Sequence, residues 1–132
     1  MKFSTRAEYG LRAMVNLARN YGNSYCSLAI IAKEEHISQA YLERLFARLK
    51  KAGLVKSTKG VNGGYQLCQK PAEIKIKAVF EALEGSLAPY YCVADGCNCL
   101  KDNRCLIQSV WGGMNEVLTK YLNSISLKNL IK

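Results

Sequence analysis

The feature that most limits the fold of this 132-residue chain is a short apolar segment followed, after a tight turn, by a longer basic segment. Residues 28–35 are mostly apolar, His36-Ile37 fits the turn, and Ser38 is of a type that caps the first turn of a helix. The basic segment repeats apolar residues at helical spacing: Leu42, Leu45, Phe46 and Leu49. Two helices joined in this way predict a helix-turn-helix.

Two short apolar runs, 54–58 and 65–68, follow the second helix directly. The glycine-rich stretch between them contains Asn62-Gly63, a pair that tolerates the positive φ angles of a tight hairpin turn. This pattern predicts a β-hairpin, and a hairpin at this place beside a helix-turn-helix is a wing. The predicted fold class is therefore mainly α, a winged helix-turn-helix with a β-hairpin wing.

Further helices are predicted before and after this motif. The first begins at Thr5, because Thr5 to Glu8 matches the pattern of a capping box, and it stops near Gly22. Its apolar residues recur at helical spacing, and so do those of a helix after Pro71: Ile76, Val79, Phe80 and Leu83. Such one-sided patterns are expected of helices packed against a core.

A long last helix is predicted from about Cys105 to Ser124. It carries two apolar stripes, of which one can pack on its own domain. A matching helix from a second copy would cover the other stripe, so we expect a homodimer with a long C-terminal dimerisation helix. The chain then divides into a winged helix-turn-helix domain in 1–72 and a cysteine loop with dimerisation helices in 73–132.

Positive charge is concentrated in the first half of the chain. Residues 1–70 hold 12 Lys/Arg against four Asp/Glu, whereas residues 71–132 hold seven against six. This distribution indicates a polyanionic partner for the winged helix, although a solvated basic surface has the same composition. No apolar run is long enough to span a membrane, and the charged N-terminus lacks the apolar core of a secretory signal. We expect a cytoplasmic protein without a membrane partner.

The outward side of the second motif helix carries the residues expected to meet double-stranded DNA. Side chains near the N-terminus of such a helix reach base edges in the major groove, and the candidates are Ser38, Gln39, Tyr41 and Arg44. Arg44 suits guanine and Gln39 suits adenine, because each forms two hydrogen bonds to that base. Glu43 would accept from cytosine or exclude other sequences.

Phosphate contacts are expected from basic side chains around this helix and on the wing. On the helices and the hairpin the candidates are Arg6, Arg48, Lys50, Lys51 and Lys56. At the wing tip Lys59 and Asn62 stand on a glycine-rich backbone, including Gly63, that suits close approach to the minor groove. A winged helix that only docks proteins is the alternative.

Six cysteines are many for an intracellular chain of this length, and four of them fall within 14 residues. Their pattern is Cys92-x4-Cys97-x-Cys99-x5-Cys105. Disulfides are rare in a reducing compartment, so clustered thiols indicate an iron–sulfur cluster or zinc. The paired C-x2-C knuckles of common zinc sites are missing. Cys26 and Cys68 lie in apolar segments, where we expect them to be buried.

Motifs of the common enzyme classes are missing from the sequence. It has neither a Walker lysine motif nor a dinucleotide fingerprint, and it contains one histidine, His36. An electron carrier would have little use for a basic recognition helix. We do not expect an enzyme.

The chain resembles, over nearly its whole length, the winged-helix regulators that include the iron–sulfur cluster regulator (IscR) and the nitric-oxide-sensing repressor (NsrR). The resemblance is carried by RAEYGLRAM at 6–14, ISQAYLERL at 37–45, KAGLV at 51–55, GGY at 63–65, and the cysteine loop leading into Cys105 and Trp111. It implies a dimeric repressor or activator of a DNA operator, with crossing C-terminal helices and an iron–sulfur cluster (2Fe–2S or 4Fe–4S) at the dimer interface. It also implies that the residue at position 43 influences which operator the protein binds, and that this choice depends on cluster occupancy.

The resemblance also suggests cluster ligands. The family's three cysteines map onto Cys92, Cys99 and Cys105. Cys97 is an extra thiol that replaces the middle ligand or adds a fourth, and Gln108 stands where the cluster regulator has a histidine. Nitric-oxide-sensing relatives use an acidic residue donated by the other subunit, and Glu8 occupies that place; the alternative is that Glu8 only completes the capping box. A cluster-free or zinc-containing regulator that responds through thiol chemistry is the alternative for the whole segment.

Overall fold

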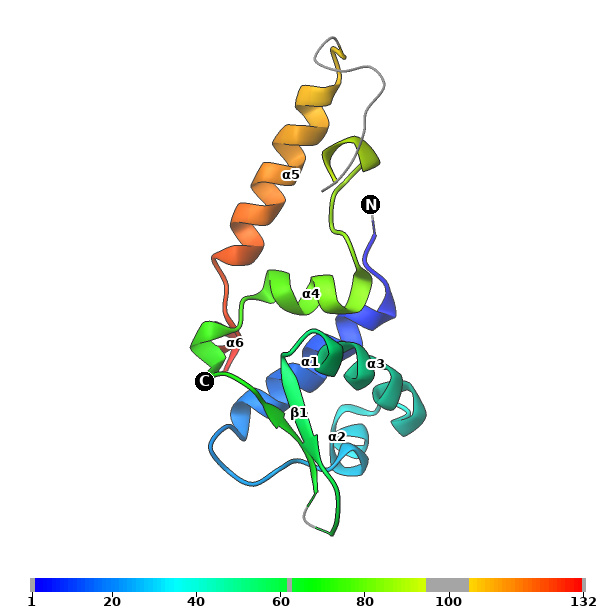
Figure 1. Ribbon diagram of the computed structural model, residues 1–132, viewed down its shortest axis with the longest axis vertical. Helices are drawn as coiled ribbons and strands as arrows, with labels where there is room; N and C mark the ends of the chain where they lie inside the picture. The colour runs from blue at the N-terminus through cyan, green and yellow to red at the C-terminus, as the bar shows by residue number, and fades with distance from the viewer. Residues whose placement is uncertain (1, 62, 95–104, 132) are drawn as a thin grey trace.

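The computed structural model describes residues 2–61, 63–94 and 105–131. Figure 1 shows an elongated molecule, with the N-terminal helices and a hairpin gathered at one end and one long helix extending away from them. The elements in chain order are α1 (Thr5–Arg19), α2 (Leu28–Glu35), α3 (Gln39–Lys51), β1 (Val55–Thr58), β2 (Gly64–Leu67), η1 (Pro71–Glu73), α4 (Ile76–Glu84), η2 (Tyr91–Val93), α5 (Gln108–Asn123) and α6 (Leu127–Leu130). The fold class is the predicted one, mainly α with an antiparallel hairpin after the helix-turn-helix.

The helix-turn-helix forms from α2 and α3. The Ser27 hydroxyl accepts a hydrogen bond from the N–H of Ala29 (3.1 Å), and the Ser38 hydroxyl accepts one from the N–H of Tyr41 (3.2 Å). Each helix therefore begins at a serine cap, as predicted for α3. Between them His36 adopts a left-handed conformation with a φ angle of 57°, which ends α2 sharply.

The first helix, α1, begins at Thr5 as predicted, but its cap is Ser4. The Ser4 hydroxyl accepts from the N–H of Arg6 (3.1 Å), whereas the Thr5 hydroxyl pairs with a tyrosine of α3 (2.9 Å). The Glu8 carboxylate pairs with Arg12 (3.0 Å) on the next turn. The predicted capping box was therefore wrong, because other partners hold both of its side chains.

The wing is a two-stranded antiparallel hairpin in which Val55 lies opposite Leu67. β1 begins one residue later than the predicted run 54–58 and ends with it, and β2 lies one residue earlier than the predicted run 65–68. The backbone of Tyr65 also exchanges two hydrogen bonds of 2.8 Å with that of Cys26, in the segment before α2. At Gly64, where φ is 147°, a Cβ atom would lie 2.2 Å from the carbonyl oxygen of Cys26. Only glycine allows so close an approach, which fixes the hairpin against the helix-turn-helix.

The hydrophobic core joins α1, α2, α3 and the hairpin to α4 and the C-terminal segment. Fully buried side chains come from both halves of the chain, among them Met14, Phe46, Val79, Leu83 and Leu127. In Figure 1, α4 lies across α1 and α3. The division of the chain at residue 72 stays a prediction.

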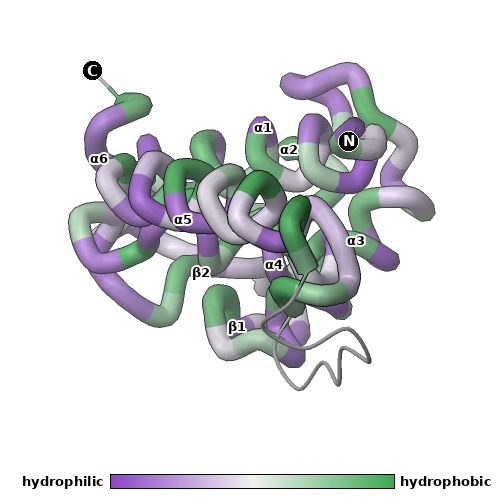
Figure 2. Tube along the Cα trace, turned by 90° about the horizontal axis from the view of Figure 1, so that it is seen from above, coloured by the Kyte–Doolittle hydropathy of each residue, from purple (hydrophilic) through white to green (hydrophobic). Residues whose placement is uncertain are grey.

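The long helix α5 begins after the predicted start at Cys105, because Leu106 and Ile107 form a turn. The short helix α6 was not predicted. Backbone hydrogen bonds from Ile76 to Ile125 (2.9 Å) and from Leu127 to Ile74 (3.0 Å) hold the C-terminal segment beside the start of α4. The base of α5 is thereby fixed to the core, and Figure 2 shows hydrophobic residues recurring along the helix. None of the helices in the described ranges is long and apolar enough to cross a membrane.

Candidate nucleic-acid interface and cysteine segment

One side of α3 is buried and the other is polar. Its four core residues are almost fully covered, whereas Tyr41 is half-buried. The remaining predicted DNA contacts of this helix and its cap are exposed: Ser38, Gln39, Glu43, Arg44, Arg48, Lys50 and Lys51. In Figure 1, α3 and the wing lie toward the end of the molecule opposite α5. A polar, mostly basic helix beside a hairpin is the arrangement that enters a major groove while the wing contacts the flanking backbone.

Tyr41 links α3 to α1. Its hydroxyl lies 2.9 Å from the Thr5 hydroxyl, and its ring meets the ring of Tyr9 edge-on, with 5.9 Å between centroids. The guanidinium of Arg44 lies over the same ring at 5.7 Å from its centroid. These contacts restrict both side chains, so the arginine predicted to read guanine is partly oriented before DNA arrives.

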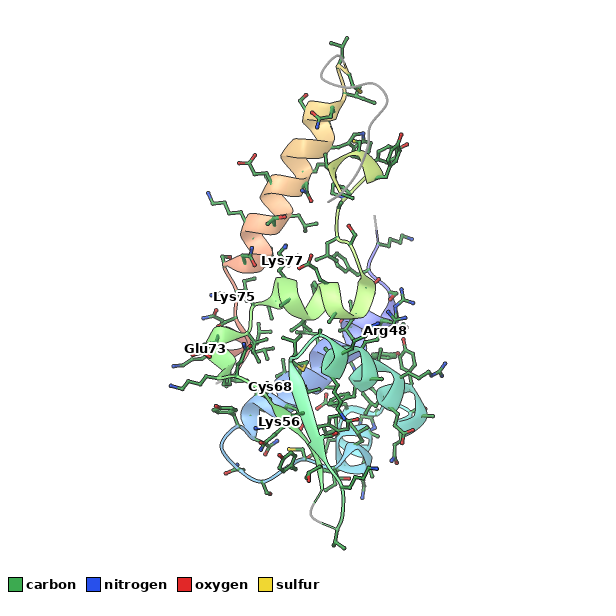
Figure 3. All side chains as sticks on the ribbon, viewed as in Figure 1. Arg48, Lys56, Cys68, Glu73, Lys75 and Lys77 are labelled. Atoms are coloured by element: carbon green, nitrogen blue, oxygen red, sulfur yellow. The ribbon has the colours of Figure 1, made fainter. Side chains whose placement is uncertain are left out.

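Two predicted phosphate contacts meet at the end of α4. The carbonyl oxygen of Leu83 accepts from Nε of Arg6 (3.1 Å) and from Nη1 of Arg48 (3.4 Å). Figure 3 shows Arg48 beneath this end of α4. The last carbonyls of a helix carry partial negative charge, which favours cationic partners. Both arginines therefore have a structural partner in addition to the role predicted for them.

Glu84 is a charged residue of this region that the sequence did not reveal. Its carboxylate accepts hydrogen bonds from the N–H of Ser4 (3.0 Å), from the Ser4 hydroxyl and from the N–H of Ala7 (3.3 Å), and it lies 3.5 Å from Arg6. Burial alone would raise the pKa of Glu84, but the hydrogen bonds from Ser4, the charge of Arg6 and the Ala7 N–H outweigh it and lower the pKa. The anion binds the N-terminus of α1 to the C-terminus of α4. No local sequence pattern signals a contact between residues 80 positions apart.

The wing carries the remaining predicted contacts. Lys56 and Lys59 are exposed, whereas Lys50 of α3 donates to the Ser57 hydroxyl of β1 (2.8 Å) and so connects helix and wing. The N–H of Gly63 donates to the carbonyl oxygen of Gly60 (3.0 Å), which closes the turn at the tip. Asn62 lies outside the described residues.

Of the four clustered cysteines, Cys97 and Cys99 lie outside the described residues. Cys92 belongs to η2 and Cys105 precedes α5, and both are half-buried. The ring of Tyr90 stacks on that of Trp111, with 5.1 Å between centroids and 18° between planes. Within 2–61, 63–94 and 105–131 no three His, Cys, Asp or Glu side chains are grouped as metal ligands would be.

The other candidate ligand, Glu8, lies on the surface of α1. Its side chain is 60% exposed and pairs with Arg12. Both residues line a groove of about 470 Å³ with Leu11 and Val15.

The two remaining cysteines differ from each other. Cys26 is half-buried, and burial, followed by the nearby Glu34 carboxylate, raises the pKa of its thiol. Cys68 is exposed, so the prediction that it is buried was wrong (Figure 3). The reason is strand alternation: Leu67 points into the core, and the next side chain points outward.

These features define a winged helix-turn-helix protein with a basic recognition helix. The chain belongs to the Rrf2 family, described as iron-dependent transcriptional regulators, which matches residues 3–132. It is therefore a transcriptional regulator of the DNA-binding type and not an enzyme.

Known relatives support this assignment along the whole chain. Protein rrf2 of Nitratidesulfovibrio vulgaris is 36% identical over 132 residues, which cover 100% of this chain and 88% of that protein. The regulator IscR of Klebsiella pneumoniae is 35% identical over 131 residues, covering 99% and 80%.

Two solved structures are similar as well. CymR, the global cysteine regulator of B. subtilis, superimposes with a TM-score of 0.82 at 34% identity, covering 98% of this chain and 95% of that one. IscR of T. potens gives a TM-score of 0.77 at 37% identity, covering 98% and 85%.

Proposed function

We propose that this regulator is a cytoplasmic homodimer that represses transcription by binding a double-stranded DNA operator, and that an iron–sulfur cluster on its cysteine segment controls operator affinity. The observation that carries the proposal is the exposed basic helix α3 together with four cysteines clustered in the sequence just before the uncovered helix α5. The signal to which the cluster responds is iron–sulfur status, nitric oxide or redox state.

Each part of the DNA-binding face has a separate task in this proposal. Arg44 and Gln39 read base edges, with Ser38, Tyr41 and Glu43 beside them at the first turns of α3. Phosphates are held by Arg6, Arg48, Lys51 and the wing residues Lys59, Asn62 and Gly63. Most described members of this set are exposed, which supports these tasks, whereas Arg6, Tyr41 and Gly63 are half-buried.

The uncovered side of α5 supports dimerisation. Val110, Met114, Val117 and Tyr121 are 57%, 42%, 69% and 61% exposed. They line an apolar groove of about 670 Å³ that extends to Pro89. A stripe of this kind is unusual on the surface of a monomer, and a second α5 would remove it from water.

The donor set of the cysteine segment fits iron. Four cysteines lie within 14 residues of sequence, and the two that the structure describes, Cys92 and Cys105, are half-buried. Cys92, Cys105 and Cys99 or Cys97 would hold the cluster, and Glu8 of a second copy is the candidate for a further ligand. When bound, the cluster would supply reversible electron transfer and a group that nitric oxide or oxygen removes.

Anaerobic purification tests the cluster. We expect visible absorption together with bound iron and acid-labile sulfide, and we expect Cys92→Ser to remove all three. The matched control is Cys68→Ser, because Cys68 is exposed and lies outside the segment. A colourless protein that contains zinc, or no metal, would contradict the cluster and favour a regulator that responds through thiol chemistry. The assignment as a DNA-binding regulator would be unaffected.

Selection from a random duplex library tests the operator. We expect enrichment of a two-fold symmetric site, because a C2 dimer presents two copies of α3. Recovery of unrelated sequences by the wild-type protein would contradict sequence-specific repression.

A further inference from the structure

We infer that Tyr90 and Trp111 form an aromatic clamp that holds Cys92 against the first turns of α5 before any metal binds. The stacked rings lie 5.1 Å apart at an interplanar angle of 18°. They come from two segments that each carry a clustered cysteine. Trp111 follows Cys105 by less than two helical turns, and Cys92 follows Tyr90 by two residues.

Tyr90 lies next to the turn that contains Cys92, so the restraint that the stack places on Tyr90 reaches Cys92. Tyr90 is the residue before η2, and its carbonyl oxygen accepts from the N–H of Val93 (3.2 Å). A second bond joins the N–H of Ala94 to the carbonyl oxygen of Tyr91 (3.1 Å). Cys92 lies inside this hydrogen-bonded turn. Its backbone therefore moves with the Tyr90 ring, and fixing the ring fixes the cysteine.

Residues at the end of η2 also border α5. Val93 and Ala94 face Asn115 and Thr119 across an open groove of about 220 Å³, so small and polar side chains border the gap. Tyr91 packs on Tyr90 at 4.7 Å but remains 62% exposed. The Tyr90–Trp111 stack is a large apolar contact between the residue before η2 and the first turn of α5.

The clamp sets the separation of Cys92 and Cys105 in the metal-free protein. A site whose ligands are already positioned loses less conformational freedom when it binds metal. The relevance to iron rests on the proposed function, whereas the clamp itself does not. Tyr90 and Trp111 are positioning residues in this proposal, since neither is a ligand.

Alkylation of the metal-free, reduced protein tests the clamp without iron. The rate of Cys92 modification by iodoacetamide is followed by mass spectrometry in wild type, Trp111→Ala and Trp111→Phe. Loss of the stack in W111A should raise the rate of Cys92 alkylation about fivefold, which corresponds to the interaction free energy of a typical aromatic pair. The rate in W111F should stay near that of the wild type. The exposed Cys68 serves as internal control and should not change. Equal Cys92 rates in wild type and W111A would overturn the clamp.

If W111A disturbs the fold, the half-buried Cys26 should be alkylated faster as well. A second variant covers this case. Tyr90→Ala leaves α5 intact, and Trp111 is the sole tryptophan of the chain, so its fluorescence reports the stack directly. We expect emission at longer wavelength in Y90A and unchanged emission in Y90F. Identical spectra for Y90A and wild type would contradict the stack.

Iron binding then separates the two proposals. Under anaerobic reconstitution, Y90A should hold iron about tenfold more weakly than wild type in competition with a chelator, as expected for loss of a supporting shell. Equal iron affinities of Y90A and wild type would overturn the positioning role of the clamp in metal binding. Failure of the wild type to take up iron would instead contradict the proposed iron–sulfur cluster. The alkylation result would still test the clamp in the metal-free protein.

Discussion

Arg6 of α1 and Arg48 of α3 donate hydrogen bonds to one acceptor, the carbonyl oxygen of Leu83 at the end of α4. Both arginines are also predicted to contact phosphate. A phosphate that draws either guanidinium away would exchange this carbonyl for a charged acceptor. If these phosphate contacts form, DNA binding would be connected to the end of α4 from which the chain continues toward the cysteine segment.

Arg48→Ala should weaken binding to every DNA sequence to a similar extent, because phosphate contacts carry no sequence information. The slope of log K against log salt concentration should fall by about 0.9, the contribution of one phosphate contact. Fluorescence anisotropy over a salt series measures it. Arg19→Ala is the matched control, since Arg19 is exposed at the far end of α1. An unchanged slope for R48A would limit Arg48 to its contact with Leu83.

Arg44→Ala should reduce specificity more than general affinity. A bidentate contact to guanine discriminates by about 1–3 kcal/mol, and Arg44 is partly oriented on the Tyr41 ring. Titration of the selected site and its single-base variants should show loss of preference at one base pair in each half-site. Lys77→Ala on α4 is the control and should keep the wild-type preferences. A uniform loss of affinity over all sites would make Arg44 a phosphate contact instead.

Glu84→Gln should destabilise the fold at neutral pH and flatten its acid dependence. The pKa of Glu84 is lowered in the folded protein below its ordinary value of 4.5, so its stabilisation is fully present above that value. It is lost as pH falls through the lower, folded-state pKa. Urea unfolding at several pH values below neutrality measures the free energy of unfolding. Parallel pH profiles for E84Q and wild type would show that Glu84 does not contribute.

Gly64→Ala should prevent normal folding or cost at least about 2 kcal/mol, because a methyl group would meet backbone and require an unfavourable φ angle. Gly60→Ala is a useful comparison: its φ of 111° is also unfavourable, but nothing lies within 4 Å of the added carbon. Thermal unfolding should therefore rank G64A below G60A. The reverse order would show that the contact with Cys26 is unimportant.

Val117→Glu should convert the proposed dimer into a monomer, since it places a charge in the middle of the apolar stripe of α5. Sedimentation equilibrium gives the mass directly. Glu116→Gln changes an exposed neighbour on the same turn and should leave the dimer intact. A monomeric wild-type protein would remove both the dimer and the two-fold operator.

The winged helix was predictable because its signals are local. Ser38 caps α3, the apolar spacing of 42–49 marks the buried side, and glycine-rich residues mark the wing tip. The capping box at Thr5 failed because the side chains it needed were engaged by residues of α3 and of the next turn of α1. Cys68 was wrongly predicted to be buried because the prediction used the apolar composition of its segment. The alternation of side chains along the strand determines which of them are buried.

Long-range contacts of the candidate site were beyond a single sequence. The bonds of Glu84 to the start of α1, and of Arg48 to Leu83, join helices that only the folded core brings together. The Tyr90–Trp111 stack is of the same kind, since nothing in the spacing of the two residues indicates that they meet.

The most direct test of the central claim compares operator affinity with and without iron. Fluorescence anisotropy on the selected duplex, in one buffer under anaerobic conditions, gives the Kd of the iron-loaded and the metal-free dimer. We predict a difference of about 5- to 150-fold, the usual range for coupling between two sites. Equal Kd values for the two forms would contradict regulation by the cysteine segment, and absence of binding by either form at low ionic strength would contradict the DNA-binding face itself.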